Sequence, residues 1–329
     1  MQPHDAGELR RLLVCPGCRG DLGWASDVAH CRDCGASYPV RDGIPVLLPA
    51  GHQHDAHDEI EHLHKHAQAG YFGRALAEEF EIERPYGAPA AYGWTLERKF
   101  ERAVRRLDPL AGRTVADVCA GSGMDAEMLA RRGARVLAFD ISEGCARRAK
   151  ARAERHGVPY LAVVADAERL PLRDAAVDIA FVHDGLHHLE RPEDGIDEMA
   201  RVASRAVSIN EPADAAATRV AIRLRLALER EDAGNRVARL DAREVTARLQ
   251  RLGFDAVAER YFAYYRHTPG NFMQLASRGP LIPAYRALSS AADAAIGRWG
   301  NKLQVTATRR AGSAAAGAAD LASGLLRSA

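Results

Sequence analysis

The chain has 329 residues, with 45 Lys or Arg, 44 Asp or Glu and a formal net charge of +1. Because the charges nearly cancel, no global field draws the protein to nucleic acid or to a membrane, although local basic clusters are compatible with this balance. The opening MQPHDAGELRRLL lacks the apolar segment of a secretory signal, and no stretch reaches membrane-spanning length. We therefore expect a cytoplasmic protein with no membrane span, in which paired cysteines more often bind metal than form disulfides.

Residues 9–50 contain two matched CxxC pairs, and we interpret them as a zinc-ribbon module. Four thiolates on two short loops can complete the tetrahedral coordination of Zn²⁺, and a module of about forty residues needs such a metal to fold. Four cysteines paired by chance and a redox CxxC are the less favoured alternatives. The expected structural metal ligands are Cys15, Cys18, Cys31 and Cys34.

Residues 51–70 include six histidines in GHQHDAHDEIEHLHKHAQ. His62 and His66 would lie one above the other on a helix and, with a nearby carboxylate, could collect a divalent ion. No fixed ligand geometry follows from the pattern, so we favour a solvated linker and assign no site.

Residues 71–310 form the expected catalytic domain, and residues 311–329 a low-complexity tail. Helical spacing over Trp94–Leu107 predicts a helix that precedes the first strand of the sheet. Strands then alternate with helices, which predicts a parallel sheet with right-handed crossovers. The predicted strands are 115–118, 136–139, 160–165, 177–182 and 206–209, followed by helices at 216–232 and 241–252 and an antiparallel pair at 254–262 and 302–308. The forty residues between that last pair make an unusually long insertion, a kind of segment that often carries specificity.

The glycine turn after the first of these strands predicts a ligand site. Gly121 and Gly123 let the backbone approach a ligand closely, and Asp140 ends the next strand, where parallel strands open onto a crevice. GSGMDA also fits a dinucleotide site. Asp117 instead favours a site for S-adenosylmethionine, because a carboxylate just before the turn repels a pyrophosphate but attracts the ammonium group of that cofactor.

These motifs together resemble class I S-adenosylmethionine-dependent methyltransferases of the ubiquinone and menaquinone methyltransferase branch. VADVCAGSG resembles the first motif, with Cys119 in place of its first glycine, and LPL, VDIA and HHL with a following proline match the later ones. The resemblance implies a Rossmann-like α/β fold with a mostly parallel seven-stranded sheet. It also implies a set of cofactor-binding residues: Asp117, Gly121 and Gly123 for the methionyl end, Asp140 for the ribose, Asp166 and Ala167 for the adenine, and in addition Ile141 and His183.

The cysteine module resembles the small zinc-ribbon family that activates RNA and protein methyltransferases. The likeness rests on the LLxCPxC opening, the second CxxC and the closing YPVRDGIPVLLP, which predicts strands around an Asp42-Gly43 turn. A closed zinc site performs no chemistry, so docking, substrate presentation or covering of the catalytic domain is the expected role.

If the acceptor must lose a proton before methyl transfer, imidazoles near the site are the natural bases. His187 is the first candidate and His183 the second, while Asp184 could orient either. The favoured function is methyl transfer to a small molecule such as a lipid, a glycan intermediate or a secondary metabolite. The alternatives are an RNA methyltransferase, an NAD-dependent oxidoreductase and a non-catalytic adaptor, and the oligomeric state is left open.

Overall fold

The computed structural model describes residues 3–49, 70, 78–189, 191–215, 218–219, 223, 238–264 and 269–312. Most of the histidine-rich segment, most of the helix expected over 216–232 and most of the C-terminal tail lie outside these residues. The helices are α1 (Pro3–Arg10), α3 (Glu78–Glu83), α4 (Ala90–Val104), α5 (Met124–Arg131), α6 (Glu143–His156), α7 (Pro192–Val202), α9 (Ala242–Arg251), α10 (Asn271–Ala276) and α11 (Leu281–Ile296), with 3-10 turns η1 (Leu186–His188) and η2 (Gly297–Trp299).

The strands form one sheet in the order β1-β2-β3-β4-β7-β6-β5-β8-β9-β11-β10. Their bounds are β1 (Leu22–Trp24), β2 (Val28–Cys31), β3 (Ser37–Arg41), β4 (Ile44–Leu47), β5 (Thr114–Val118), β6 (Arg135–Asp140), β7 (Leu161–Ala165), β8 (Val177–His183), β9 (Ala203–Pro212), β10 (Phe254–Tyr261) and β11 (Lys302–Arg309). The seven strands from β7 to β10 confirm the predicted seven-stranded sheet. Five of them are parallel, and β11 and β10 run antiparallel as predicted.

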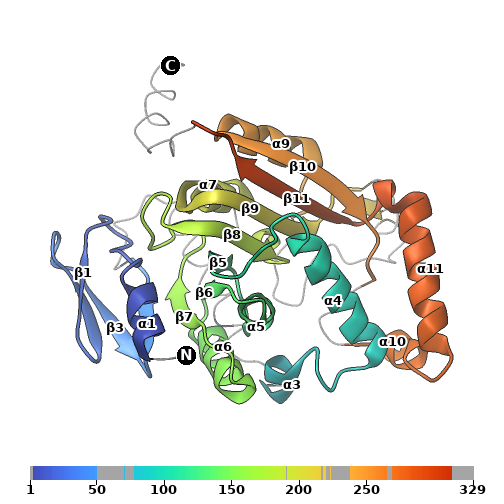
Figure 1. Ribbon diagram of the computed structural model, residues 1–329, viewed down its shortest axis with the longest axis horizontal. Helices are drawn as coiled ribbons and strands as arrows, with labels where there is room; N and C mark the ends of the chain where they lie inside the picture. The colour runs from blue at the N-terminus through green and yellow to red at the C-terminus, as the bar shows by residue number, and fades with distance from the viewer. Residues whose placement is uncertain are drawn as a thin grey trace.

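The cysteine module does not stand apart from this sheet (Figure 1). The predicted hairpin is present, with β3 and β4 joined through Asp42 and Gly43, both at positive φ. β4 then pairs in parallel with β7, with Val46 opposite Val164. The module therefore covers the β7 edge, which would otherwise present unpaired backbone groups to solvent.

Two apolar clusters cover the two faces of the sheet, because successive strand residues point to opposite sides. One face receives α4, α5 and α6, packed on side chains such as Val115 and Val136. The other receives α7 and α9 together with residues of the cysteine module, packed on side chains such as Val118 and Phe139. The carboxyl ends of β5, β6, β7 and β8 consequently meet at one edge of the molecule, where the glycine turn lies.

Three helix boundaries follow ordinary capping chemistry. Asp241 caps α9 by accepting hydrogen bonds from the backbone amides of Arg243 and Glu244. Gly157 and Gly253, at φ of 62° and 86°, follow α6 and α9 in the left-handed conformation that closes a helix. The helix predicted from Trp94 begins earlier, at Ala90, directly after Pro89, and ends at Val104. None of the helices in the described ranges is both long and apolar enough to cross a bilayer.

Candidate active site and cysteine cluster

The glycine turn between β5 and α5 adopts a conformation that depends on small residues. Cys119, Gly121 and Gly123 have φ of 56°, 55° and 76°. A Cβ atom added at Gly121 would meet nothing within 4 Å, so the backbone faces open space there. Cys119 occupies a left-handed position that favours glycine, which explains why the family motif has glycine at that place.

Asp117 is the most deeply buried acid of this turn. It is 1% exposed, and its Oδ2 atom has no hydrogen-bond partner. Burial, reinforced by the charges of Asp125 and Asp140, raises the pKa of the Asp117 carboxyl well above its usual value of 3.8. A buried carboxylate oxygen without a partner fits a cationic ligand group and opposes a phosphate.

Asp140 lies at the end of the neighbouring strand and is tied to the same turn. Its carboxylate accepts hydrogen bonds from the backbone amides of Gly121 and Ser142, each at 2.9 Å. Burial raises the pKa of Asp140, and these two amides offset part of the rise. Ile141 directly follows Asp140, and both are only partly buried.

Asp166 and Ala167 directly follow β7 at the same edge of the sheet. The Oδ1 atom of Asp166 accepts a hydrogen bond from the amide of Glu168 at 2.9 Å. Both residues are partly exposed. The structure therefore brings the three predicted acids, Asp117, Asp140 and Asp166, to the carboxyl ends of three adjacent strands.

His183 ends β8 and makes a contact that the sequence did not indicate. Its Nδ1 atom lies 3.0 Å from Oδ1 and 3.1 Å from Oδ2 of Asp125, on the first turn of α5. An ionised carboxylate only accepts hydrogen bonds, so this contact assigns the donor role to Nδ1, and a neutral ring with that tautomer has its lone pair on Nε2. Nε2 is buried without a partner. Asp125 was not among the predicted site residues, because an acid in the first turn of a helix is common for its dipole alone.

His187 belongs to a different network, centred on Glu211 at the end of β9. The His187 Nδ1 atom lies 2.7 Å from Oε2 of Glu211. The other oxygen of that carboxylate accepts hydrogen bonds from the amides of Gly185 and Leu186, both at 2.7 Å. Glu211 is fully buried, so this network holds the η1 turn against β9.

Asp184, predicted to orient a histidine, instead lies between two buried lysines. Its carboxylate forms ion pairs with Lys302, at 2.7 Å, and with Lys99. Burial alone would raise the pKa of Asp184, but the two ammonium groups outweigh it and hold the pKa well below 3.8. The backbone of Asp184 is left-handed, with φ of 52°, so these pairs fix the turn that follows His183.

The four cysteines of the N-terminal module come together as predicted. Their sulfur atoms all lie within 4.8 Å of one another, with Cys15 and Cys34 3.7 Å apart and Cys18 and Cys31 3.4 Å apart. Zn–S bonds of 2.3 Å in a tetrahedron place sulfur atoms about 3.8 Å apart, so the donor set fits Zn²⁺. Burial disfavours the Cys15 thiolate, but hydrogen bonds from Tyr38 and backbone amides outweigh it and lower the Cys15 pKa to about 6.

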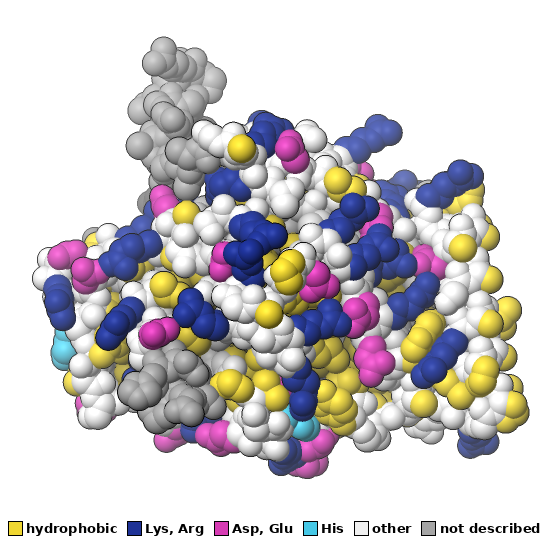
Figure 2. Space-filling model, in the orientation of Figure 1, with side chains coloured by type: hydrophobic (Ala, Val, Ile, Leu, Met, Phe, Trp, Pro, Cys, Tyr) yellow, Lys and Arg dark blue, Asp and Glu magenta, His cyan; other side chains and the backbone are white. Residues whose placement is uncertain are grey.

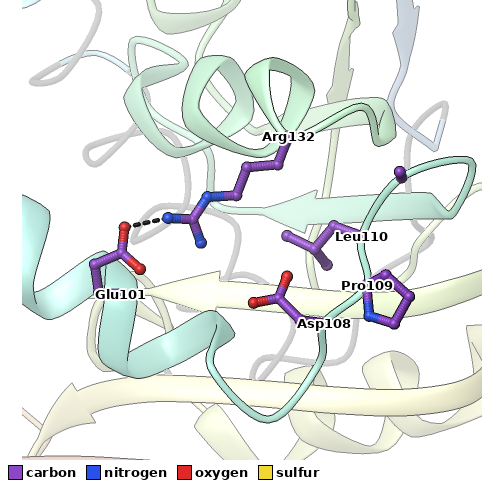
Figure 3. A pocket seen from close by; sticks show the side chains of 6 residues that line it. Glu101, Asp108, Pro109, Leu110 and Arg132 are labelled. Carbon is purple, nitrogen blue, oxygen red and sulfur yellow. Dashed lines mark hydrogen bonds and ion pairs between the residues drawn. The ribbon is translucent and has the colours of Figure 1, made fainter.

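A separate hollow of about 600 Å³ lies near the amino end of β5, away from this edge (Figure 3). Arg132 and Glu101 form an ion pair across its rim. The lining residues are Glu101, Asp108, Pro109, Leu110, Ala111 and Arg132. It brings together no set of catalytic groups, and we assign it no role.

The strand order and the glycine-turn site define a Rossmann-like fold of the class I methyltransferase type. Magnesium protoporphyrin IX methyltransferase from Synechocystis PCC 6803, solved with bound SAH, matches 75% of this chain and 100% of its own at 17% identity, with a TM-score of 0.54. The [4+2]-cyclase SpnF matches 75% of this chain and 97% of its own at 17% identity, with a TM-score of 0.52. Since one of these neighbours is named a cyclase, the fold alone does not fix the reaction.

The sequence comparisons agree with that class. The family described as "Methyltransferase domain" matches residues 116–206 of the chain. Demethylmenaquinone methyltransferase from Clavibacter sepedonicus is 39% identical over 30% of this chain and 40% of its own length. The ubiquinone/menaquinone C-methyltransferase from Acidiphilium cryptum is 36% identical over 30% of this chain and 41% of its own. The chain thus spans less than half the length of these curated relatives.

Proposed function

We propose that the protein transfers a methyl group from S-adenosylmethionine to a small quinone-like acceptor. The observation that carries this proposal is the buried Asp117 carboxylate beside the glycine turn, with one oxygen lacking a partner. It suits an ammonium group and opposes the pyrophosphate of a dinucleotide. When bound, S-adenosylmethionine supplies an electrophilic methyl group on a sulfonium centre.

The proposed cofactor contacts follow the order of the strands. Asp117 and the open backbone at Gly121 hold the amino-acid end; the amides of Gly121 and Gly123 already donate to Asp140 Oδ2 and to the Ala120 carbonyl, each at 2.9 Å. Asp140, with Ile141, faces the ribose hydroxyls, and Asp166, with Ala167, faces the adenine. Three carboxylates at adjacent strand ends also favour a cofactor of net positive charge.

We assign the proton transfer to His183, with His187 as the alternative base. His183 has a buried Nε2 atom without a partner, and Asp125 would stabilise the imidazolium that forms when Nε2 accepts a proton. A phenolic acceptor that loses its O–H proton in this way gains electron density on its ring carbons and becomes a carbon nucleophile. His187 is held by Glu211 within the η1 network, which supports a positioning role for it.

The acceptor class rests on the names of the relatives rather than on a bound ligand. Both relatives described above act, by name, on quinones of the menaquinone or ubiquinone type. The region of identity covers the cofactor half of the fold, whereas acceptor specificity in such folds comes from inserted segments. The quinone-like acceptor is therefore our proposal for this chain.

Calorimetric titration of the zinc-loaded protein with S-adenosylmethionine and, separately, with NADH tests the cofactor. We expect micromolar binding of S-adenosylmethionine only, weakened at least tenfold in Asp140→Asn, which keeps one acceptor oxygen for the Gly121 amide. Binding of NADH alone would favour an oxidoreductase. Binding of neither would favour an adaptor that uses the cysteine module to dock on a partner.

Methyl transfer is then measured with a labelled methyl group. A reduced naphthoquinone with one free ring carbon is the test acceptor, and its analogue with that carbon blocked is the matched control. We expect label in the first and none in the second. Label in bulk RNA but in neither quinone would move the assignment to the RNA alternative.

We also propose that Cys15, Cys18, Cys31 and Cys34 hold one structural Zn²⁺. The four sulfur atoms, all within 4.8 Å of one another, support it. Because β4 pairs with β7, the metal would stabilise the edge of the catalytic sheet as well as its own loops.

A further inference from the structure

The insertion between β10 and β11 exposes an unusual amount of apolar surface. In the part of the chain that the structure describes, nine large hydrophobic side chains are exposed, and seven of them lie between residues 264 and 299. Six of these belong to α10, α11 and η2: Phe272, Leu275, Leu281, Leu288, Ile296 and Trp299. Scattered exposed hydrophobics are normal, but their concentration in one segment marks an interaction surface.

The helix α11 has two distinct sides. Its inner side packs on α4, where the Tyr285 hydroxyl lies 2.8 Å from Oγ1 of Thr95 and Asp293 pairs with Arg98 at 2.9 Å. Its outer side carries Leu281, Ala284, Leu288, Ala291 and Ala295, all exposed and all on one stripe. Leu288 is 71% exposed, so no described part of the chain covers this stripe.

The charges of the insertion have one sign on its surface. Arg278, Arg286 and Arg298 are exposed, and Arg298 lies over the ring of Trp299 at 3.8 Å. The single acid between residues 269 and 300 is Asp293, whose side chain is only 7% exposed and faces α4. Figure 2 shows this end of the molecule, where α10 and α11 lie in Figure 1, with yellow side chains and dark-blue ones between them.

We propose that the α10–α11 insertion rests on an anionic lipid surface, with its exposed apolar side chains in the interface and its arginines at the headgroups. Leucine, phenylalanine and tryptophan beside basic residues are the composition of helices that lie in a membrane interface. The whole chain has a net charge of only +1, so the electrostatic part of the contact would come from these local arginines. A second copy fits less well, because a two-fold contact would bring the same arginines together.

The position of the insertion connects this surface to the cofactor turn. Met273 of α10 packs in one buried cluster with Tyr92 of α4 and with Met124, which directly follows Gly123. A lipid surface under α10 would therefore lie beside the edge where the strands end. If the proposed function holds, an apolar quinone-like acceptor would reach the site from the lipid rather than from water.

Sedimentation with vesicles tests the proposal on the full zinc-loaded chain, independently of any methyl transfer. The probes are vesicles of equal phosphatidylglycerol and phosphatidylcholine, and vesicles of phosphatidylcholine alone. We expect binding to the anionic vesicles to be at least tenfold tighter, and to weaken in 0.5 M salt. In L288E/W299E we expect a loss of at least tenfold, while Val257→Glu, at a valine on β10 that is 49% exposed, stays within twofold.

A second measurement distinguishes a lipid surface from a second copy of the chain as the partner of the α10–α11 insertion. Light scattering gives the mass of the wild-type chain and of L288E/W299E over the micromolar range. A wild-type dimer that the double variant dissociates, without vesicle binding, would overturn the proposal in favour of a second copy. Equal binding of wild type and double variant to both kinds of vesicle would also overturn it.

Discussion

The Nδ1 atom of His183 lies 3.0 Å from a carboxylate oxygen of Asp125, and the Nε2 atom on the other side of the same ring is buried without a partner. The pair joins the end of β8 to the first turn of α5, on the two sides of the glycine turn. A histidine whose tautomer is set by a carboxylate, and whose other nitrogen holds a lone pair, is arranged to accept a proton.

Replacement of His183 by alanine should lower kcat by roughly 10²- to 10⁴-fold, the usual contribution of a general base. Asp125→Asn should lower kcat by up to about 10⁴-fold, because the amide no longer sets the tautomer or stabilises the imidazolium. The cofactor Kd, measured by calorimetry, should change by less than about threefold in both variants, since the role lies in chemistry rather than binding.

The exposed His30 on β2 supplies the control for these variants. His30→Ala should leave kcat unchanged, because its exposed ring bonds to Ser37 within the cysteine module. His187→Ala should lower the melting temperature, since it removes a partner of the buried Glu211. If His187→Ala abolishes turnover at full cofactor affinity while His183→Ala does not, the base is His187.

Cofactor affinity should depend on pH through Asp117. Its pKa is raised well above 3.8, so the free protein takes up a proton there at a higher pH than an ordinary aspartate does. An ammonium-bearing ligand selects the ionised carboxylate, so binding at a pH below that pKa releases the proton. In that range the affinity falls tenfold for each unit by which the pH is lowered. Calorimetry between pH 5 and 8 in buffers of different ionisation heat measures both effects.

Two variants test whether Asp117 causes this pH dependence. Asp117→Asn should bind at least tenfold more weakly and lose the pH dependence. Asp255→Asn, at an exposed acid on β10 that pairs with Arg310, should keep both the affinity and its pH dependence. An unchanged pH dependence in Asp117→Asn would assign the proton to another group.

Local chemistry in the sequence was enough to predict the cysteine cluster, the glycine turn and the strands that carry the acids. A CxxC pair and a buried apolar run can each be recognised from a few consecutive residues. The pairing of β4 with β7 was not predicted, because the two strands are more than a hundred residues apart in the chain. The local sign of this pairing is that all four residues of β4 are buried. A continuous apolar run is typical of a strand covered on both faces.

The side-chain partners within the site were harder to predict for the same reason. Lys99 occupies a charged position of an amphipathic helix in the sequence, yet it is 1% exposed and pairs with Asp184, 85 residues away. Asp125 likewise reads as an ordinary acid at a helix start. Periodicity locates faces of elements, whereas these contacts depend on how β8, α4 and α5 meet in three dimensions.

Loss of the metal should destabilise the catalytic domain as well as the cysteine module. Structural zinc contributes on the order of 10 kcal/mol in small zinc modules, and each kcal/mol shifts the melting temperature by about 2–4 °C in domains of roughly 150–250 residues. Cys31→Ser should therefore lose one bound zinc and lower the melting temperature by about 10 °C or more. Cys145→Ser, outside the cluster, should retain one zinc per chain by elemental analysis.

The Asp184 ion pairs should make the fold sensitive to acid. The pKa of Asp184 is held well below 3.8, so its contribution to stability is present above the unfolded value and disappears as the pH falls through the folded one. Asp184→Asn leaves Lys99 and Lys302 buried without their carboxylate and should cost about 3–5 kcal/mol at pH 7 in urea unfolding. Glu101→Gln, which removes an exposed pair with Arg132, should cost less than about 1 kcal/mol.

Gly123 and Gly112 form a matched pair that separates backbone strain from steric crowding. Both are left-handed, with φ of 76° and 75°. A Cβ atom at Gly112 would meet nothing within 4 Å, so Gly112→Ala should cost only the conformational penalty of about 1–2 kcal/mol. At Gly123 a Cβ atom would collide with the Tyr160 hydroxyl and lie 3.0 Å from the Cβ of Ala149.

Gly123→Ala should therefore cost about 2–5 kcal/mol, the conformational penalty plus overpacking, in urea unfolding at neutral pH. It should also weaken cofactor binding, because the turn must shift away from α6 to relieve the contact with Ala149. Gly112→Ala lies at the amino end of β5 and should leave the cofactor Kd unchanged. Equal losses of stability in the two variants would mean that the turn relaxes freely, and that its close packing on α6 does not fix the shape of the site.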